Sequence, residues 1–169
     1  MFDVKTILPA EADNQYQGSS IALYFFVLFV VIMTCRSIVH MFFSGFGLHE
    51  IANLVHFDGE PDPSRIIHLF FSLWGFSQLI FCLICWVGIW KYRSLVPAFY
   101  MLWMLEWGGR AFLYPIFFVR LSDGAYSKGI APGAEFAPHV FLCLVLFFLL
   151  SLKRRKPKPV LMSGTKEEN

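Results

Sequence analysis

The sequence predicts an all-α fold: a four-transmembrane-helix up-down bundle with an interfacial segment in its first outer loop. Composition is the first observation, because 57% of the 169 residues are hydrophobic and only 15% are charged, whereas a soluble domain carries about 25% charged residues. The second is that the apolar residues form four long runs, and the third is a very short loop between the second and third runs. Such runs indicate membrane-spanning helices rather than barrel strands.

The four apolar runs set the predicted spans and the domain organisation. The spans cover residues 21–44, 65–90, 94–119 and 136–152. Each is long enough for a helix that crosses about 30 Å of hydrocarbon, and the short second loop allows only an antiparallel hairpin. We therefore expect one membrane domain over residues 21–152, a cytoplasmic amino-terminal segment over 1–20 and a basic, disordered cytoplasmic tail over 153–169.

The distribution of basic residues predicts the orientation. Nine of the fourteen lysines and arginines lie in the amino-terminal segment, the Lys91–Arg93 turn and the tail, whereas the first loop carries Glu50, Asp58, Glu60 and Asp62. The positive-inside rule then places both termini in the cytoplasm. We expect the membrane to be a bacterial inner membrane rather than an organelle membrane. The net charge of +2 comes mainly from the tail, where it fixes topology or contacts anionic lipid, so nucleic acid is not an expected partner.

The first outer loop contains an amphipathic stretch over residues 47–57. Helical spacing would place Leu48, Ile51, Ala52 and Val55 on one face of this stretch. We therefore expect a helical segment that lies flat at the membrane interface.

Three charged side chains lie deep within the predicted spans, apart from Arg65 at the start of the second. At a rise of 1.5 Å per residue, Arg36 and Arg110 lie about 12 to 14 Å below the outer boundary and Glu106 about 20 Å below it. Glu106 and Arg110 are four positions apart and can pair on one helix face, and Arg36 lies at a depth from which it could also reach Glu106. An unpaired charge in hydrocarbon costs at least about 2.5 kcal/mol, so these groups should face the bundle interior. The alternatives are a purely structural ion pair and a ligand pocket.

The second span carries a stripe of small and polar residues that is typical of a helix–helix seam in lipid. The stripe comprises His68, Ser72, Gly75, Gln78, Cys82 and Cys85. Cys82 and Cys85 have the spacing of a redox pair, but on a regular apolar helix they are interpreted as buried filler. Trp74 is interpreted as an interfacial anchor, and Trp107 is expected to line the face of Glu106.

Histidines form the second group of candidate residues. His40, His68 and His139 all fall about 4 to 6 Å from the outer boundary by the same count. Two imidazoles on facing helices can hold a haem iron, and three with a carboxylate could hold a metal. Interfacial hydrogen bonding is the simpler interpretation of histidines near span ends.

These observations favour a non-enzymatic membrane protein, and no catalytic residue is assigned. It would bind a lipophilic ligand such as a quinone, lipid or pigment, or act as an accessory subunit of a larger membrane complex or as a homo-oligomer in the lipid bilayer. The candidate ligand-binding residues are Arg36, His40, His68, Gln78, Glu106 and Arg110. The alternative is a redox subunit with haem b as cofactor, held by His40 or His139 against His68. A proton-coupled transporter that uses Glu106 is the third hypothesis.

Overall fold

The computed structural model describes residues 7–117 and 125–153, which form helices and no strand. The helical elements are α1 (Ser20–Phe42), α2 (Ser44–Phe46), the π-helical turn η2 (Gly47–Ile51), α3 (Ser64–Lys91), the 3-10 turn η3 (Arg93–Leu95), α4 (Val96–Gly108), the π-helical turn η4 (Gly109–Leu113), α5 (Tyr114–Phe117), α6 (Pro132–Glu135) and α7 (Ala137–Ser151). The all-α prediction is confirmed for the described residues. Most of the predicted tail and the last two residues of the predicted third span lie outside them.

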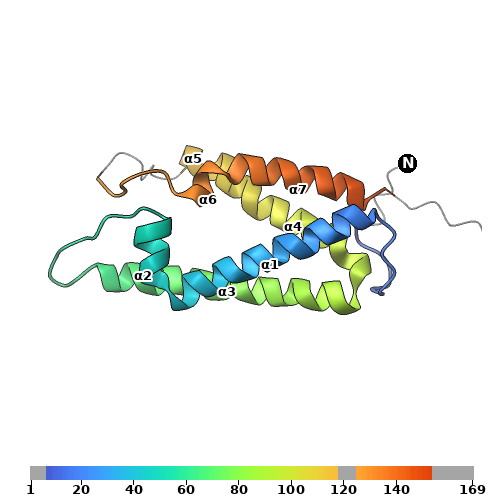
Figure 1. Cartoon of the computed structure of the whole chain (residues 1–169), viewed down its shortest axis with the longest axis horizontal. Helices are drawn as coiled ribbons and strands as arrows, with labels where there is room; N and C mark the ends of the chain where they lie inside the picture. Colours follow the sequence, from blue (N-terminus) through green and yellow to red (C-terminus); the bar gives the residue numbers. More distant parts are fainter. Residues whose placement is uncertain (1–6, 118–124, 154–169) are drawn as a thin grey trace, which may run out of the picture.

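The long helices are arranged as two pairs (Figure 1). Helix α1 packs mainly against α3, and α4 packs mainly against α7. The four helices run in alternating directions, so that α1 begins at the end of the molecule where α7 finishes. There the Ser19 amide donates a hydrogen bond to the Leu150 carbonyl at 3.2 Å. The two pairs converge at this end, which also carries the turn between α3 and α4.

Aromatic side chains join the two pairs. Phe26 on α1 and Tyr100 and Trp103 on α4 are fully buried. The Tyr100 hydroxyl donates to the Ala22 carbonyl at 2.6 Å, and the ring of Phe29 meets the ring of Trp103 edge-on at 5.1 Å between centroids. Edge-to-face packing of this kind stabilises aromatic pairs beyond the area that they bury. These contacts fix how α4 crosses α1.

The predicted seam on the second span is the face of α3 that packs against α1. Gly75, Gln78, Cys82 and Cys85 are all buried, which confirms this part of the stripe. At Gly75 the helices approach so closely that a Cβ atom would lie 2.7 Å from the Met41 amide nitrogen. Only glycine leaves room for the α1 backbone at this point, and small residues are the usual means of such an approach.

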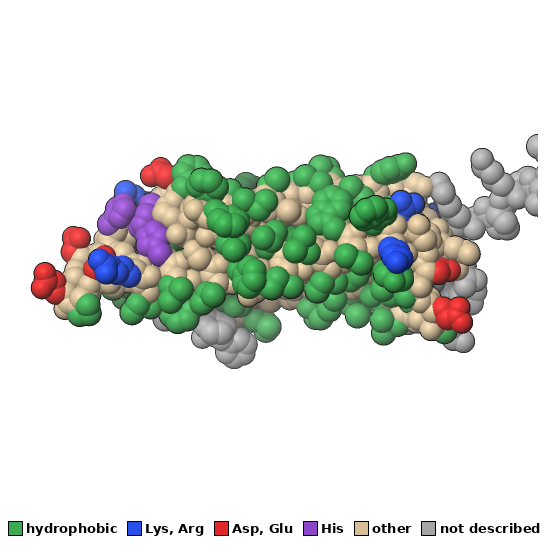
Figure 2. Space-filling view, turned by 90° about the horizontal axis from the view of Figure 1, so that it is seen from below, with side chains coloured by type: hydrophobic (Ala, Val, Ile, Leu, Met, Phe, Trp, Pro, Cys, Tyr) green, Lys and Arg blue, Asp and Glu red, His purple; other side chains and the backbone are tan. Residues whose placement is uncertain are grey.

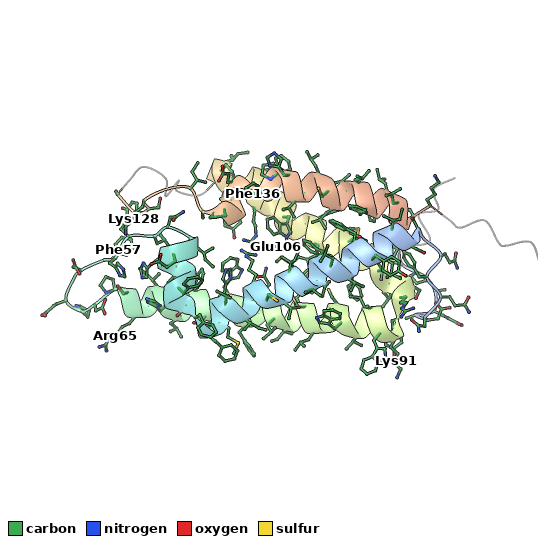
Figure 3. All side chains as sticks on the ribbon, in the orientation of Figure 1. Phe57, Arg65, Lys91, Glu106, Lys128 and Phe136 are labelled. Carbon is green, nitrogen blue, oxygen red and sulfur yellow. The ribbon has the colours of Figure 1, made fainter. Side chains whose placement is uncertain are left out.

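The surface separates apolar from charged side chains. On the face shown in Figure 2, hydrophobic side chains cover the middle of the molecule, and charged side chains gather at its two ends. Arg65 and Lys91 mark opposite ends of α3 (Figure 3). Helices α1 and α3 are long and apolar enough to cross a membrane, and α7 is a shorter apolar helix.

The interfacial helix predicted over residues 47–57 is shorter than expected. Its helical part ends at Ile51, because Asn53 adopts a left-handed backbone with φ of 58°, a conformation that interrupts a right-handed helix. Leu54 then forms an isolated antiparallel bridge with Ser127. The backbone beyond Ile51 is thus paired with the segment before α6, and the prediction of a continuous helix there is wrong.

Candidate functional site

The Glu106–Arg110 pair predicted from the four-residue spacing is present. Arg110 Nε donates to Glu106 Oε1 at 2.6 Å, and Arg110 Nη2 donates to the same oxygen. The side chains of Arg110 and Glu106 are 18% and 29% exposed. Figure 3 places Glu106 between the α4–α7 pair and α1. The charged pair therefore lies between the helix pairs and is partly shielded from the surroundings.

Arg36 does not pair with Glu106, contrary to the expectation from depth. Arg36 Nη1 donates instead to Gln78 Oε1 at 3.4 Å, and within residues 7–117 and 125–153 no carboxylate oxygen lies within 4.0 Å of its guanidinium. Gln78 Oε1 also accepts from Ser37 Oγ at 3.3 Å. Depth along a helix axis says nothing about rotation around it, and the rotation of α1 directs Arg36 toward α3.

Two indole rings connect the arginines. The Arg36 guanidinium lies 5.0 Å from the ring centroid of Trp74 and 5.7 Å from that of Trp107. The corresponding distances for Arg110 are 4.6 Å and 5.4 Å. At exposed sites such cation–π contacts contribute about 0.5 to 1 kcal/mol each, and more where water is excluded.

Trp74 is the site residue that sequence reasoning missed, since it was assigned to the interface. The signal available was its position four residues before Gln78, which puts both side chains on one face of α3.

His40 completes this group of side chains. It is 4% exposed, and its ring lies 4.7 Å from the ring of Trp74 and 4.5 Å from that of Phe71. We call the group the arginine–tryptophan cluster: Arg36, His40, Trp74, Gln78, Glu106, Trp107 and Arg110. It contains three buried polar atoms that have no hydrogen-bond partner in the described structure, namely His40 Nδ1, Glu106 Oε2 and Trp107 Nε1.

The other predicted histidines lie apart from this cluster. His68 Nδ1 is 3.0 Å from Ser44 Oγ, and exposed His139 packs against Phe136. In the part of the chain that the structure describes, no group of three histidine, cysteine, aspartate or glutamate side chains is placed to hold a metal. The predicted three-histidine metal site is therefore not assembled here, because the imidazoles share a depth but have different neighbours.

A second set of histidines is brought together that the sequence did not indicate. The rings of His49 and His56 stack at 3.8 Å between centroids, and His68 lies 5.7 Å from His49. His49 Nδ1 is also 3.0 Å from the Leu54 carbonyl oxygen. The chain reverses direction between His49 and His56 after the left-handed Asn53, and this reversal creates the contact.

The cluster is bordered by a π-helical turn. Pro115 has no amide hydrogen and cannot donate a hydrogen bond to the carbonyl of Ala111. The Tyr114 amide donates to the Gly109 carbonyl, a five-residue spacing that widens the helix just before the proline. Such π-helical turns often accompany functional sites. Arg110 lies within this turn, which sets the direction of its side chain toward Trp74.

The arrangement offers charge and hydrogen bonds in an apolar setting, without a nucleophile–base pair among the cluster residues. Comparisons of the chain with known protein families, with curated proteins and with solved structures gave no match. Chemically, the cluster can hold a polar group by ionic contacts, by hydrogen bonds to its unpartnered atoms and by stacking on the indoles.

Proposed function

We propose that the chain is a multi-pass integral membrane protein that crosses the bilayer four times and binds a lipophilic ligand with a polar head at the arginine–tryptophan cluster. A quinone, a lipid or a pigment would have this chemistry. The membrane part of the proposal is supported by two apolar helices of spanning length, α1 and α3, and by the apolar middle of the surface in Figure 2. Exposed apolar surface of this extent favours a lipid environment over water.

The third and fourth proposed crossings are supported by the lengths of the helical segments. Helical structure continues without a break from Val96 to Phe117, about 33 Å at a rise of 1.5 Å per residue. Helix α7 has 15 residues and spans about 22 Å on the same rise. A short helix can be accommodated by local thinning of the bilayer or by flanking side chains. The basic end of the molecule, with Lys91 and Arg93, would face the cytoplasm.

This topology predicts a pattern of chemical labelling. We expect Asp58→Cys to react with a membrane-impermeant maleimide in intact spheroplasts, because the first loop would lie outside. Asn14→Cys should react only after permeabilisation. Labelling of both variants is followed by a gel shift, and the unsubstituted chain, whose cysteines lie in apolar helices, gives the background. Labelling of Asn14→Cys but not of Asp58→Cys in intact spheroplasts would reverse the orientation. Labelling of both variants in intact spheroplasts would contradict a membrane crossing by α1 between them.

The ligand proposal is carried by one observation: the three unpartnered polar atoms of the cluster. Nearly all buried polar groups in folded proteins are hydrogen-bonded, and each exception needs an explanation such as a bound molecule. His40 Nδ1, Glu106 Oε2 and Trp107 Nε1 come from α1 and α4 and lie in one cluster. The imidazole and indole nitrogens can form hydrogen bonds to one polar head, while the apolar helix surfaces accommodate its hydrocarbon part.

Native mass spectrometry of the full chain, extracted in mild detergent, tests this function. We expect a small molecule to be retained, and Trp107→Phe to lower its occupancy about threefold, because one hydrogen bond from the indole Nε1 to the polar head is lost. Trp90→Phe, which changes an exposed indole near the end of α3, is the matched control and should leave the occupancy unchanged.

Three results would contradict the ligand proposal. A chain that retains no small molecule has no such function, and a chain that retains only a second protein subunit is better explained as an accessory subunit of a membrane complex. Equal loss in Trp107→Phe and Trp90→Phe would show that the ligand binds outside the cluster.

A further inference from the structure

We infer that the head of the ligand is a single negative charge on a hydrocarbon chain, either a carboxylate or a phosphodiester, and that Arg36 is the residue that binds it. The inference rests on the proposed function, because it specifies the ligand of the same cluster. It is carried by a different observation, the charge balance at Arg36.

The cluster carries one more positive charge than negative charges. Arg36 and Arg110 contribute two guanidinium groups, and Glu106 contributes the one carboxylate, which leaves a charge of +1. An uncompensated charge in an apolar layer costs at least about 2.5 kcal/mol. One monoanion would balance the cluster, whereas a dianion such as a phosphomonoester would leave it negative.

The excess charge belongs to Arg36 rather than to Arg110. Two nitrogens of Arg110 already donate to Glu106 Oε1. Arg36 has one hydrogen bond to a neutral acceptor, Gln78 Oε1, at the long distance of 3.4 Å. A guanidinium carries five N–H donors in a planar fork that matches a carboxylate or a phosphodiester. Most of the donors of Arg36 therefore remain for an anion.

The surroundings of Arg36 define where the head would lie. The guanidinium lies near the indole rings of Trp74 and Trp107. The backbone of α6 is also close to it, since a Cβ atom at Gly133 would be 3.5 Å from Arg36 Nη2. Trp107 is 5% exposed and its Nε1 has no partner in the described structure. A head at Arg36 that accepts hydrogen bonds can accept from this indole as well, which a head with donors alone cannot do.

A hydrocarbon chain on the anion is favoured by the flanking residues. Phe70 and Leu73 on α3 and Leu105 on α4 are exposed apolar side chains on the helices that also carry Trp74 and Glu106. An acyl chain that lies along these apolar side chains gains contact area while its head stays at Arg36. A free inorganic anion would gain none of this contact and would have to leave water to reach the site.

The test compares an acid with its neutral ester. cis-Parinaric acid is a fluorescent long-chain carboxylate, and its binding to the full chain in nanodiscs can be followed by energy transfer from tryptophan. We expect the acid to bind about tenfold more tightly than its methyl ester, since a charge-assisted hydrogen bond is added. Arg36→Gln should remove this preference. Arg65→Gln, at a side chain that is 89% exposed, should retain it, and Arg36→Lys should retain part of it.

The wild-type comparison needs no variant, so the inference stays testable if Arg36→Gln does not fold. Equal binding of acid and ester would overturn the anion and leave a lipophilic ligand in place. Binding of neither, together with an empty chain in native mass spectrometry, would overturn both proposals. Retention of the preference in Arg36→Gln would exclude Arg36 as the residue responsible.

Competition separates the two sources of the anion. Displacement of the acid by phosphatidylglycerol, but not by phosphatidylcholine, would assign the site to a phosphodiester lipid. A lack of displacement by phosphatidylglycerol would assign it to a free carboxylate. Displacement by both lipids alike would show that the acyl chain alone is recognised and would overturn the inference.

Discussion

Gly75→Ala will lower the free energy of unfolding by about 2 to 3 kcal/mol, the upper part of the range of about 1 to 3 kcal/mol expected for overpacking, because the clash is with backbone. Helix propensity alone predicts the opposite sign, since alanine is favoured over glycine by about 1 kcal/mol in a helix interior. Packing overrides propensity at this position. A Cβ atom there would lie 2.7 Å from the Met41 amide nitrogen and 2.9 Å from the His40 carbonyl carbon, and backbone atoms cannot move aside as the end of a flexible side chain can.

Gly109→Ala is the matched control for this prediction. A Cβ atom at Gly109 would have no neighbour within 4 Å, so the variant should be unchanged or more stable by about 0.5 to 1 kcal/mol. Unfolding of both variants in mild detergent, followed by tryptophan fluorescence, gives the two values. Equal stability of Gly75→Ala and Gly109→Ala would show that α1 and α3 do not approach as closely as described. Because the clash involves His40, Gly75→Ala should also weaken any ligand held at the cluster.

Local patterns in the sequence predicted the local features of the site. The Glu106–Arg110 pair follows from spacing along one helix, and no knowledge of neighbouring helices is needed to foresee it. Gly75 and Gln78 were predicted to be on a seam because small and polar residues recur on one face. Both inferences hold because a regular helix has a fixed angle between successive residues.

Features that depend on the rotation of one helix against another were not predicted. Arg36 was expected to reach Glu106 on grounds of depth, but it bonds to Gln78, because depth leaves the rotation of α1 undetermined. The role of Trp74 was missed for the same reason. The π-helical turn at Gly109 changes the direction in which the residues after it point around the helix axis. The spacing of apolar residues in the sequence does not reveal such a change. His49 and His56 meet only because the chain reverses at Asn53.

The second large effect is expected for Arg110→Ala, which should lower the free energy of unfolding by about 2 to 3 kcal/mol. Removal of one partner of a fully buried ion pair costs about 3 to 5 kcal/mol, because the remaining charge is left uncompensated. The figure is reduced here because Arg110 and Glu106 keep 18% and 29% of their side-chain exposure, and exposed pairs contribute far less. The loss includes the contacts of Arg110 with Trp74 and Trp107.

A double-mutant cycle separates the ion pair from these ring contacts. In Arg110→Ala the Glu106 carboxylate loses its donors, so adding Glu106→Gln should recover at least about 1 kcal/mol, a coupling of the size seen for directly bonded groups. If the losses instead add without coupling, the ring contacts of Arg110 account for the effect and the carboxylate has another partner. The cycle also bears on charge balance, because Arg110→Ala brings the cluster from +1 to zero. In that variant the preference for an acid over its ester should fall with the excess charge that produces it.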